Sequence, residues 1–209
     1  LGNSTPVVVA PNLPKPFQLK EQKNKDKQKG ELRLVSVARI SPEKNMKYAL
    51  EVLEQYEGRG NISFDIFGPV YDQAYWEECQ SVIERLPANV TATYKGSIES
   101  AKVADTLSQY HALFMPTRGE NFGHVILESF TAGCPVIISD QTPWRNLAIL
   151  NIGYDLSLAD KANFTRAIEE LLEMDQQCFQ ASSNQAFKYA EQYIGNKEAI
   201  AQNRRMFTK

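Results

Sequence analysis

Two glutamates with seven residues between them are the side chains best suited to chemistry. Glu120 stands directly before Asn121-Phe122-Gly123, and Glu128 lies within a run of apolar residues. A carboxylate among buried apolar groups costs several kcal/mol, or its pKa changes, unless a donor satisfies it. The positions one helical turn from Glu128 carry no lysine or arginine. Its partner is therefore either His124 or hydroxyl groups of a ligand, such as a ribose or a hexose.

Two cations with four residues between them follow the first apolar run, in the segment Arg39-Ile40-Ser41-Pro42-Glu43-Lys44-Asn45. Ser41 followed by Pro42 is a favourable N-cap and N1 pair, which predicts a helix that begins there with Lys44 in its first turn. Cations oppose the dipole at that end of a helix, so the pattern indicates an anion held between Arg39 and Lys44. The alternative is that both cations are solvated and that Glu43 pairs with one of them.

A second anion site is predicted where a strand passes into a helix. The loop Thr117-Arg118-Gly119 and the segment Asn121-Phe122-Gly123 supply backbone N–H groups and the positive end of a helix dipole, which could hold a phosphate or a sugar. Gly123 would let the backbone approach a ligand closely. An ordinary strand-to-helix turn is the alternative. His124 could hydrogen-bond the ligand or Glu128, or it could be structural.

These residues need a scaffold, and the apolar pattern alternates between strands and helices. Strands are predicted at Leu32–Ala38, Ile62–Phe67, Val90–Tyr94, Ala112–Met115 and Pro135–Ser139. Helices are predicted at Met46–Tyr56, Tyr71–Leu86, Val103–Tyr110 and Phe122–Ala132, and then at 160–174, 177–194 and 197–207. The helix from Phe122 is apolar almost throughout and should be buried. Four or five strands separated by helices predict a Rossmann-like α/β fold, a doubly wound parallel sheet with helices on both faces.

Composition limits the class of protein. The chain has 209 residues, 43% of them hydrophobic, and a formal charge of −2, which suits one α/β domain with appendages and argues against nucleic-acid binding. No apolar run approaches the roughly 20 residues of a membrane span. Three widely spaced cysteines indicate reduced, structural thiols in a cytoplasmic protein. The lysine-rich stretch 20–29 contains no apolar or aromatic residue, so it predicts a solvated linker rather than a nucleic-acid patch.

Several other kinds of site are excluded. His111 and His124 lie far apart in sequence with no Cys or Asp at ligand spacing, so no metal site is predicted. The chain has no GxGxxG fingerprint of a nicotinamide dehydrogenase and no GxxxxGK[ST] of a P-loop enzyme.

The E-x7-E spacing, with Asn-Phe-Gly after the first Glu and Ala-Gly-Cys-Pro-Val-Ile (132–137) after the second, resembles the signature of the group 1 (GT4-type) glycosyltransferases. These are retaining enzymes of the two-lobed GT-B architecture. The resemblance implies that Glu120 meets hydroxyls of the transferred sugar and that Glu128 meets the nucleotide ribose. Arg39 and Lys44 match the Arg-x4-Lys pattern by which the family grips the donor pyrophosphate. Asn45 stands where the family often has glycine.

By this resemblance the chain is the C-terminal, donor-binding lobe, and it moves a hexose from a UDP- or GDP-hexose to a hydroxyl acceptor without a metal or other cofactor. Glu120, Arg39 and Lys44 would be catalytic, and the donor-binding set would be Arg39, Lys44, Glu120, Asn121, Phe122, Gly123 and Glu128. The family's turn after the second strand faces the nucleotide. Here Gly68-Pro69 lacks its Gly-x-Gly form, so a ligand contact and a plain turn both remain open.

The expected organisation is a crossover or linker over 1–30, a nucleotide-sugar-binding domain over 31–175 and C-terminal helices over 176–209. We expect an acceptor lobe to precede Leu1 and to bind most of a sugar or lipid-linked acceptor, so this chain alone should bind nucleotide weakly and transfer nothing. The full enzyme would work in polysaccharide biosynthesis in the cytoplasm, peripherally associated with the inner face of the membrane. A nucleotide-sugar epimerase of the same fold and a non-catalytic nucleotide-sugar-binding module remain alternatives.

Overall fold

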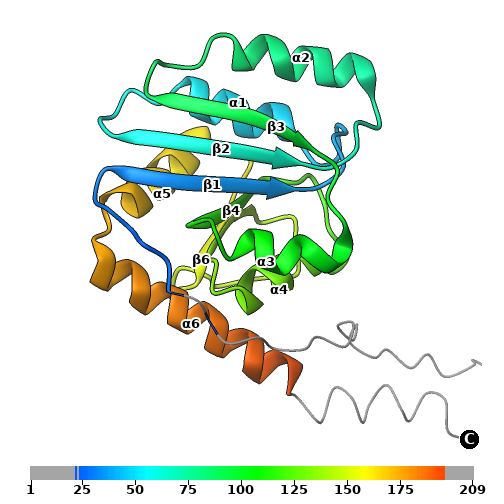
Figure 1. Ribbon diagram of the computed structural model, residues 1–209. Helices are drawn as coiled ribbons and strands as arrows, with labels where there is room; N and C mark the ends of the chain where they lie inside the picture. The colour runs from blue at the N-terminus through cyan, green and yellow to red at the C-terminus, as the bar shows by residue number, and fades with distance from the viewer. Residues whose placement is uncertain (1–21, 23, 196–209) are drawn as a thin grey trace, which may run out of the picture.

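The computed structural model describes residue 22 and residues 24–195. Its centre is a six-stranded, wholly parallel sheet in the order β3-β2-β1-β4-β5-β6 (Figure 1). The strands are β1 Glu31–Val37, β2 Asn61–Phe67, β3 Val90–Gly96, β4 Ala112–Met115, β5 Val136–Ser139 and β6 Gly153–Leu156. The order reverses between β1 and β4, which makes the sheet doubly wound.

Helices cover both faces of this sheet (Figure 1). The helices α1 Met46–Glu54, α2 Gln73–Ile83 and α5 Lys161–Glu173 share one core with the sheet. The short η1 Ser100–Lys102 and the helices α3 Val103–Leu107, α4 His124–Thr131 and α6 Gln176–Ile194 lie on the other side. The predicted fold class, a Rossmann-like doubly wound parallel sheet with helices on both faces, is confirmed.

The central strands explain why the two cores form. All four residues of β4 are buried, and alternate side chains point to opposite faces. Phe114 joins the core of α1, α2 and α5, whereas Leu113 and Met115 join the core of α3, α4 and α6. A parallel strand covered on both faces therefore has a continuous apolar run, the pattern by which it was predicted.

The sixth strand was not predicted. β6 pairs with β5 at the edge of the sheet, and its last three residues are only partly buried. An edge strand with one acidic residue, Asp155, has no continuous apolar run. The carboxylate of Asp155 instead accepts hydrogen bonds from the backbone N–H groups of Asn146, at 3.2 Å, and Leu147, at 2.9 Å.

The predicted helix start at Ser41 is wrong. A series of turns follows β1, and α1 begins only at Met46, after Asn45 with φ +60°. The buried side chain of Asn45 donates from Nδ2 to the carbonyl of Pro116, at 3.0 Å. Because asparagine tolerates the left-handed conformation and this contact holds it there, the helix starts later than the Ser-Pro pair suggests. Lys44 therefore lies in a loop, ahead of the helix.

The predicted solvated linker is wrong for Lys25 and Lys27, whereas Asn24, Asp26, Gln28 and Lys29 are exposed. Lys25 and Lys27 are only 4% and 3% exposed. The Lys25 ammonium donates to the carbonyls of Gly133, at 2.9 Å, and Leu107, at 3.4 Å, just after α4 and at the end of α3. Carbonyls at the C-terminal end of a helix have no intrahelical partner and carry the negative end of its dipole, so they bind cations. Tertiary structure thus buries two lysines of an otherwise exposed polar segment.

His111 holds the same segment against β1. Its Nδ1 accepts from the Arg33 backbone N–H at 3.0 Å, and its Nε2 lies 2.9 Å from the Asp26 carbonyl, to which it donates. Burial lowers the pKa of His111 to about 3, so the ring is neutral. Its role is structural.

The C-terminal part of the chain packs on α4. Ser183 of α6 donates to the Gly133 carbonyl at 2.6 Å, and Phe179 meets the ring of His111 at 5.1 Å. The predicted helix 197–207 lies outside the described residues, and the domain boundaries stay predictions. Among the described residues, no helix is long and apolar enough to cross a membrane.

Candidate functional site

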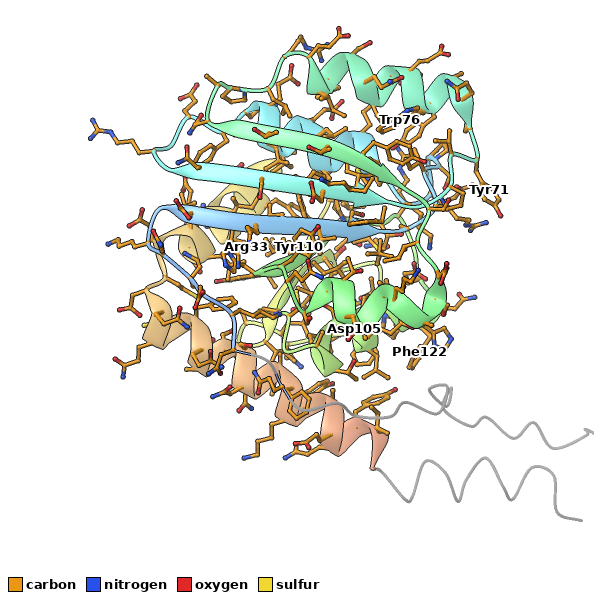
Figure 2. All side chains as sticks on the ribbon, in the orientation of Figure 1. Arg33, Tyr71, Trp76, Asp105, Tyr110 and Phe122 are labelled. Atoms are coloured by element: carbon orange, nitrogen blue, oxygen red, sulfur yellow. The ribbon has the colours of Figure 1, made fainter. Side chains whose placement is uncertain are left out.

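Most of the predicted site residues lie in the loops that follow β1 and β4, the two strands at which the sheet order reverses, whereas His124 and Glu128 lie on α4 and Gly68 follows β2. The carboxyl ends of parallel strands meet at one edge, so these loops are neighbours. Figure 2 shows Tyr71 and Phe122 on the side of the molecule to which the strand arrows point.

Direct hydrogen bonds join the loop after β1 to the loop after β4. The Glu43 carbonyl accepts from the backbone N–H of Arg118, at 2.9 Å, and from the hydroxyl of Thr117, at 3.0 Å. The Asn45 amide reaches the carbonyl of Pro116. The two loops form one hydrogen-bonded unit, although Asn45 and Pro116 are 71 positions apart in the sequence.

Lys44 and Glu120 meet within this unit. The Lys44 ammonium forms an ion pair with Oε1 of Glu120, and each side chain is only 16% exposed. The backbone N–H of Glu120 donates to the Gln141 carbonyl at 3.0 Å, so the loop after β5 holds the glutamate from its other side. The alternative, in which both cations are solvated and Glu43 pairs with one of them, is wrong for Lys44, which pairs with Glu120. A cation and a carboxylate from distant segments thus converge at the switch point.

Arg39 lies at the same edge but is exposed, and its guanidinium carbon sits 5.1 Å from the centre of the Tyr71 ring. The pKa of the exposed Glu43 carboxyl is held below its usual value, first by the Ser41 hydroxyl, then by its own backbone, and also by the charges of Arg39 and Lys44. Both cations therefore act on the same small region, as the sequence pattern predicts.

The helix α4 begins beside the ion pair. Its N-cap is Gly123 with φ +75°, and no side chain caps its N-terminus. This positive φ, rather than the 2.7 Å between a built Cβ and the flexible end of Ile126, requires glycine in the turn. The Trp144 indole N–H donates to the Phe122 carbonyl and holds this turn in place. The first-turn N–H groups, free of a side-chain cap, suit an anion.

The expectation that α4 is buried on all sides is wrong. Ile126, Leu127 and Phe130 are buried, but His124 is exposed and Glu128, one turn further along, is half-buried. The His124 ring packs against Phe122 with ring centres 4.7 Å apart. His124 and Glu128 therefore share an outward stripe of the helix, next to the loops that carry Lys44 and Glu120.

Gly68 follows β2 at the same edge and has φ +141°. A Cβ there would lie 1.9 Å from the carbonyl oxygen of Ala38, so only glycine lets the two loops approach this closely. The Tyr94 hydroxyl donates to the Gly68 carbonyl at 2.9 Å. This close approach explains the glycine without a ligand.

Two partners of the site escaped the sequence analysis: Tyr71, which stacks on Arg39, and the Gln141 carbonyl, which binds the Glu120 N–H. Both follow strands that neighbour a predicted site strand, and strand order alone could have pointed to them. Among the described residues, no group of three or more His, Cys, Asp or Glu could hold a metal ion.

The fold and the site together define an α/β protein with a charged cluster at the switch point of a doubly wound sheet, the place where such folds bind nucleotides. The family model of the group 1 glycosyl transferases matches residues 17–192. The chain therefore belongs to the group 1 glycosyltransferase family. A search of curated protein sequences finds no match.

Solved structures share the fold. A variant of S. aureus TarM, in complex with Fondaparinux, alpha-GlcNAc-glycerol and UDP, is 14% identical with a TM-score of 0.75, over 99% of this chain and 40% of its own. Anabaena Alr3699/HepE in complex with UDP-glucose is 18% identical with a TM-score of 0.65, over 84% and 47%. WaaG, a glycosyltransferase involved in lipopolysaccharide biosynthesis, is 20% identical with a TM-score of 0.62, over 83% and 44%. The chain thus spans less than half the length of these proteins.

Proposed function

We propose that this chain is the donor-binding lobe of a retaining GT4-type glycosyltransferase that transfers a hexose from a UDP- or GDP-sugar to a hydroxyl acceptor. The observation that carries the proposal is the meeting of Lys44 and Glu120 at the switch point, with Arg39 at the same edge. The cation suits a phosphate and the carboxylate suits sugar hydroxyls. The UDP and UDP-glucose bound to TarM and HepE favour UDP as the nucleotide.

In this proposal the cations and the N-terminus of α4 bind the donor pyrophosphate. The bond between the sugar's anomeric carbon and the phosphate oxygen breaks, and its electron pair stays on the β-phosphate. Arg39, Lys44 and the uncapped N–H groups of α4 stabilise that negative charge. The acceptor oxygen attacks the anomeric carbon from the same face, and its proton passes to the leaving phosphate.

Glu120 and Glu128 would orient the sugar nucleotide. Donor binding draws Lys44 from Glu120 towards the phosphate, and Glu120 then accepts hydrogen bonds from the sugar hydroxyls. Glu128, on the outward stripe of α4, binds the ribose. Asn121, Phe122 and Gly123 shape the turn between the two glutamates.

The positive charge of Arg39 and Lys44 does the work that a divalent metal does in other transferases, so the reaction we propose is metal-independent. The acceptor, a sugar or a lipid-linked sugar, would bind mainly to a preceding lobe. The complete enzyme would act in polysaccharide biosynthesis at the cytoplasmic face of a membrane.

A thermal-shift panel of UDP, GDP and ADP tests donor binding. A ligand at 100 times its dissociation constant stabilises by about 2.7 kcal/mol, or roughly 5–10 °C in Tm for a domain of this size. The shift should survive EDTA and become much smaller in Arg39→Ala and Lys44→Ala. Lys47→Ala is the matched control, because its ammonium pairs with Glu78 on the surface of α1 and α2. Equal shifts in all three variants, or none with any nucleotide, would refute the proposal.

A further inference from the structure

One exposed aromatic side chain stands at the edge of the candidate site. Tyr71, in the loop after β2, is 66% exposed, far more than Tyr94 at 38%. Figure 2 shows it at the edge where the strands end. A large apolar ring held in water at this place has no role in the core.

The contact that Tyr71 does make is with a residue of the site. The guanidinium carbon of Arg39 lies 5.1 Å from the ring centre, within the range of a cation–π interaction. Arginine stacks on aromatic faces more readily than lysine does, because its guanidinium is planar and weakly hydrated. Arg39 is otherwise exposed.

The backbones of the two residues are fixed against each other. The Tyr71 N–H donates to the Ile40 carbonyl at 3.1 Å, and the Ile40 N–H donates to the Pro69 carbonyl at 2.9 Å. Gly68 packs directly against the backbone of Ala38. The backbones of Arg39 and Tyr71 therefore cannot drift apart, and only the side-chain torsions of these two residues remain to be ordered.

We propose that Tyr71 is a positioning residue that stacks on Arg39 and orders its guanidinium for the donor pyrophosphate. This inference rests on the proposed function, because it assigns Arg39 an anionic ligand. A long, exposed arginine side chain loses much rotamer entropy when it binds a phosphate. A ring that already restricts those rotamers lowers that loss and so raises the affinity.

Nuclear magnetic resonance of the unliganded chain tests the stacking without any nucleotide. In the wild type and in Tyr71→Phe, the δ-methylene protons of Arg39 should be displaced upfield by the ring, and its side-chain N–H should be ordered. Tyr71→Ala should lose both signatures with little change in Tm, because the ring is exposed. Identical Arg39 spectra in Tyr71→Ala and the wild type would overturn the inference.

Titration with UDP tests the purpose of the stacking. A surface cation–π contact corresponds to about a two- to fivefold change in affinity, so Tyr71→Ala should weaken UDP binding by that factor and Tyr71→Phe should restore it. In an Arg39→Ala background, Tyr71→Ala should have no further effect. An equal loss in that background would mean that the ring contacts the ligand itself, which overturns the positioning role. If the wild type stacks but binds none of UDP, GDP and ADP, the proposed function is wrong, and the stacking does not serve a nucleotide.

Discussion

Replacement of Lys27 should test how the segment before β1 is held against the C-terminal end of α5. Its ammonium donates to the carbonyls of Leu172 at 2.9 Å, Met174 at 3.0 Å and Gln28 at 2.8 Å. The first two carbonyls end α5, whose C-cap residue Met174 has extended backbone. Lys27 therefore caps the helix in place of a glycine turn. Burial lowers the pKa of Lys27 to about 8, so the ammonium is still charged at pH 7.

The cost of Lys27→Met follows from the remaining donors. The Leu172 carbonyl still accepts from the Gly30 N–H at 2.9 Å, and the Gln28 carbonyl from the Glu31 N–H at 3.1 Å. Each of these two carbonyls loses one hydrogen bond and keeps another, which costs about 1 kcal/mol of stability. The Met174 carbonyl loses the donor itself, which costs about 1–3 kcal/mol. The sum is about 3–5 kcal/mol, or a fall in Tm of roughly 6–20 °C.

Urea and thermal unfolding at pH 7 measure this loss. Lys29→Met is the matched control: the Lys29 ammonium pairs with Glu173 at 3.1 Å, but the two side chains are 66% and 57% exposed. Exposed pairs contribute little, so this change should cost less than about 0.5 kcal/mol. If the free energies of unfolding of Lys27→Met and Lys29→Met differ by less than about 1 kcal/mol, Lys27 is as solvated as Lys29 and does not cap α5.

Two further predictions concern His111 and Glu120. Because the pKa of His111 falls to about 3 on folding, the unfolded chain binds an extra proton below pH 6.5, and stability should drop by about 2 kcal/mol between pH 7 and pH 5. In urea unfolding at pH 5, 6 and 7, His111→Gln, which cannot titrate, should lose less stability than the wild type as the pH falls. An equal loss of stability in both proteins would contradict the buried neutral ring. Glu120→Gln removes the carboxylate that competes for Lys44, so calorimetric titration should find UDP bound about fivefold more tightly. Weaker UDP binding in this variant would mean that Glu120 prepares Lys44 for the phosphate.

Much of the fold was accessible from local patterns. The continuous apolar runs of β4 and β5 predicted buried parallel strands, and the helix periodicity predicted α5 and α6 to within a few residues. Apolar runs do not predict an element whose position is fixed by tertiary contacts rather than by hydrophobic burial. β6 is a short edge strand, and α1 starts after Asn45 because a contact with the loop after β4 holds that residue in a left-handed conformation.

The sequence by itself determined the kinds of side chain at the site and their order. Arg39 and Lys44 follow one strand and Glu120 follows another, so a parallel sheet must bring them to the same edge. The tertiary structure alone decided their partners. Lys44 pairs with Glu120 across 76 residues, and Arg39 stacks on Tyr71 from the loop after β2. Side-chain pairing depends on which strands are neighbours in the sheet, and no local pattern contains that information.

The same reason explains the buried lysines. Nothing in the polar stretch around Lys25 and Lys27 distinguishes it from a solvated linker, because its partners are helix-end carbonyls up to 147 residues away. Those carbonyls exist only once the helices have formed and packed. Only the folded chain therefore decides that these two cations lie inside the protein.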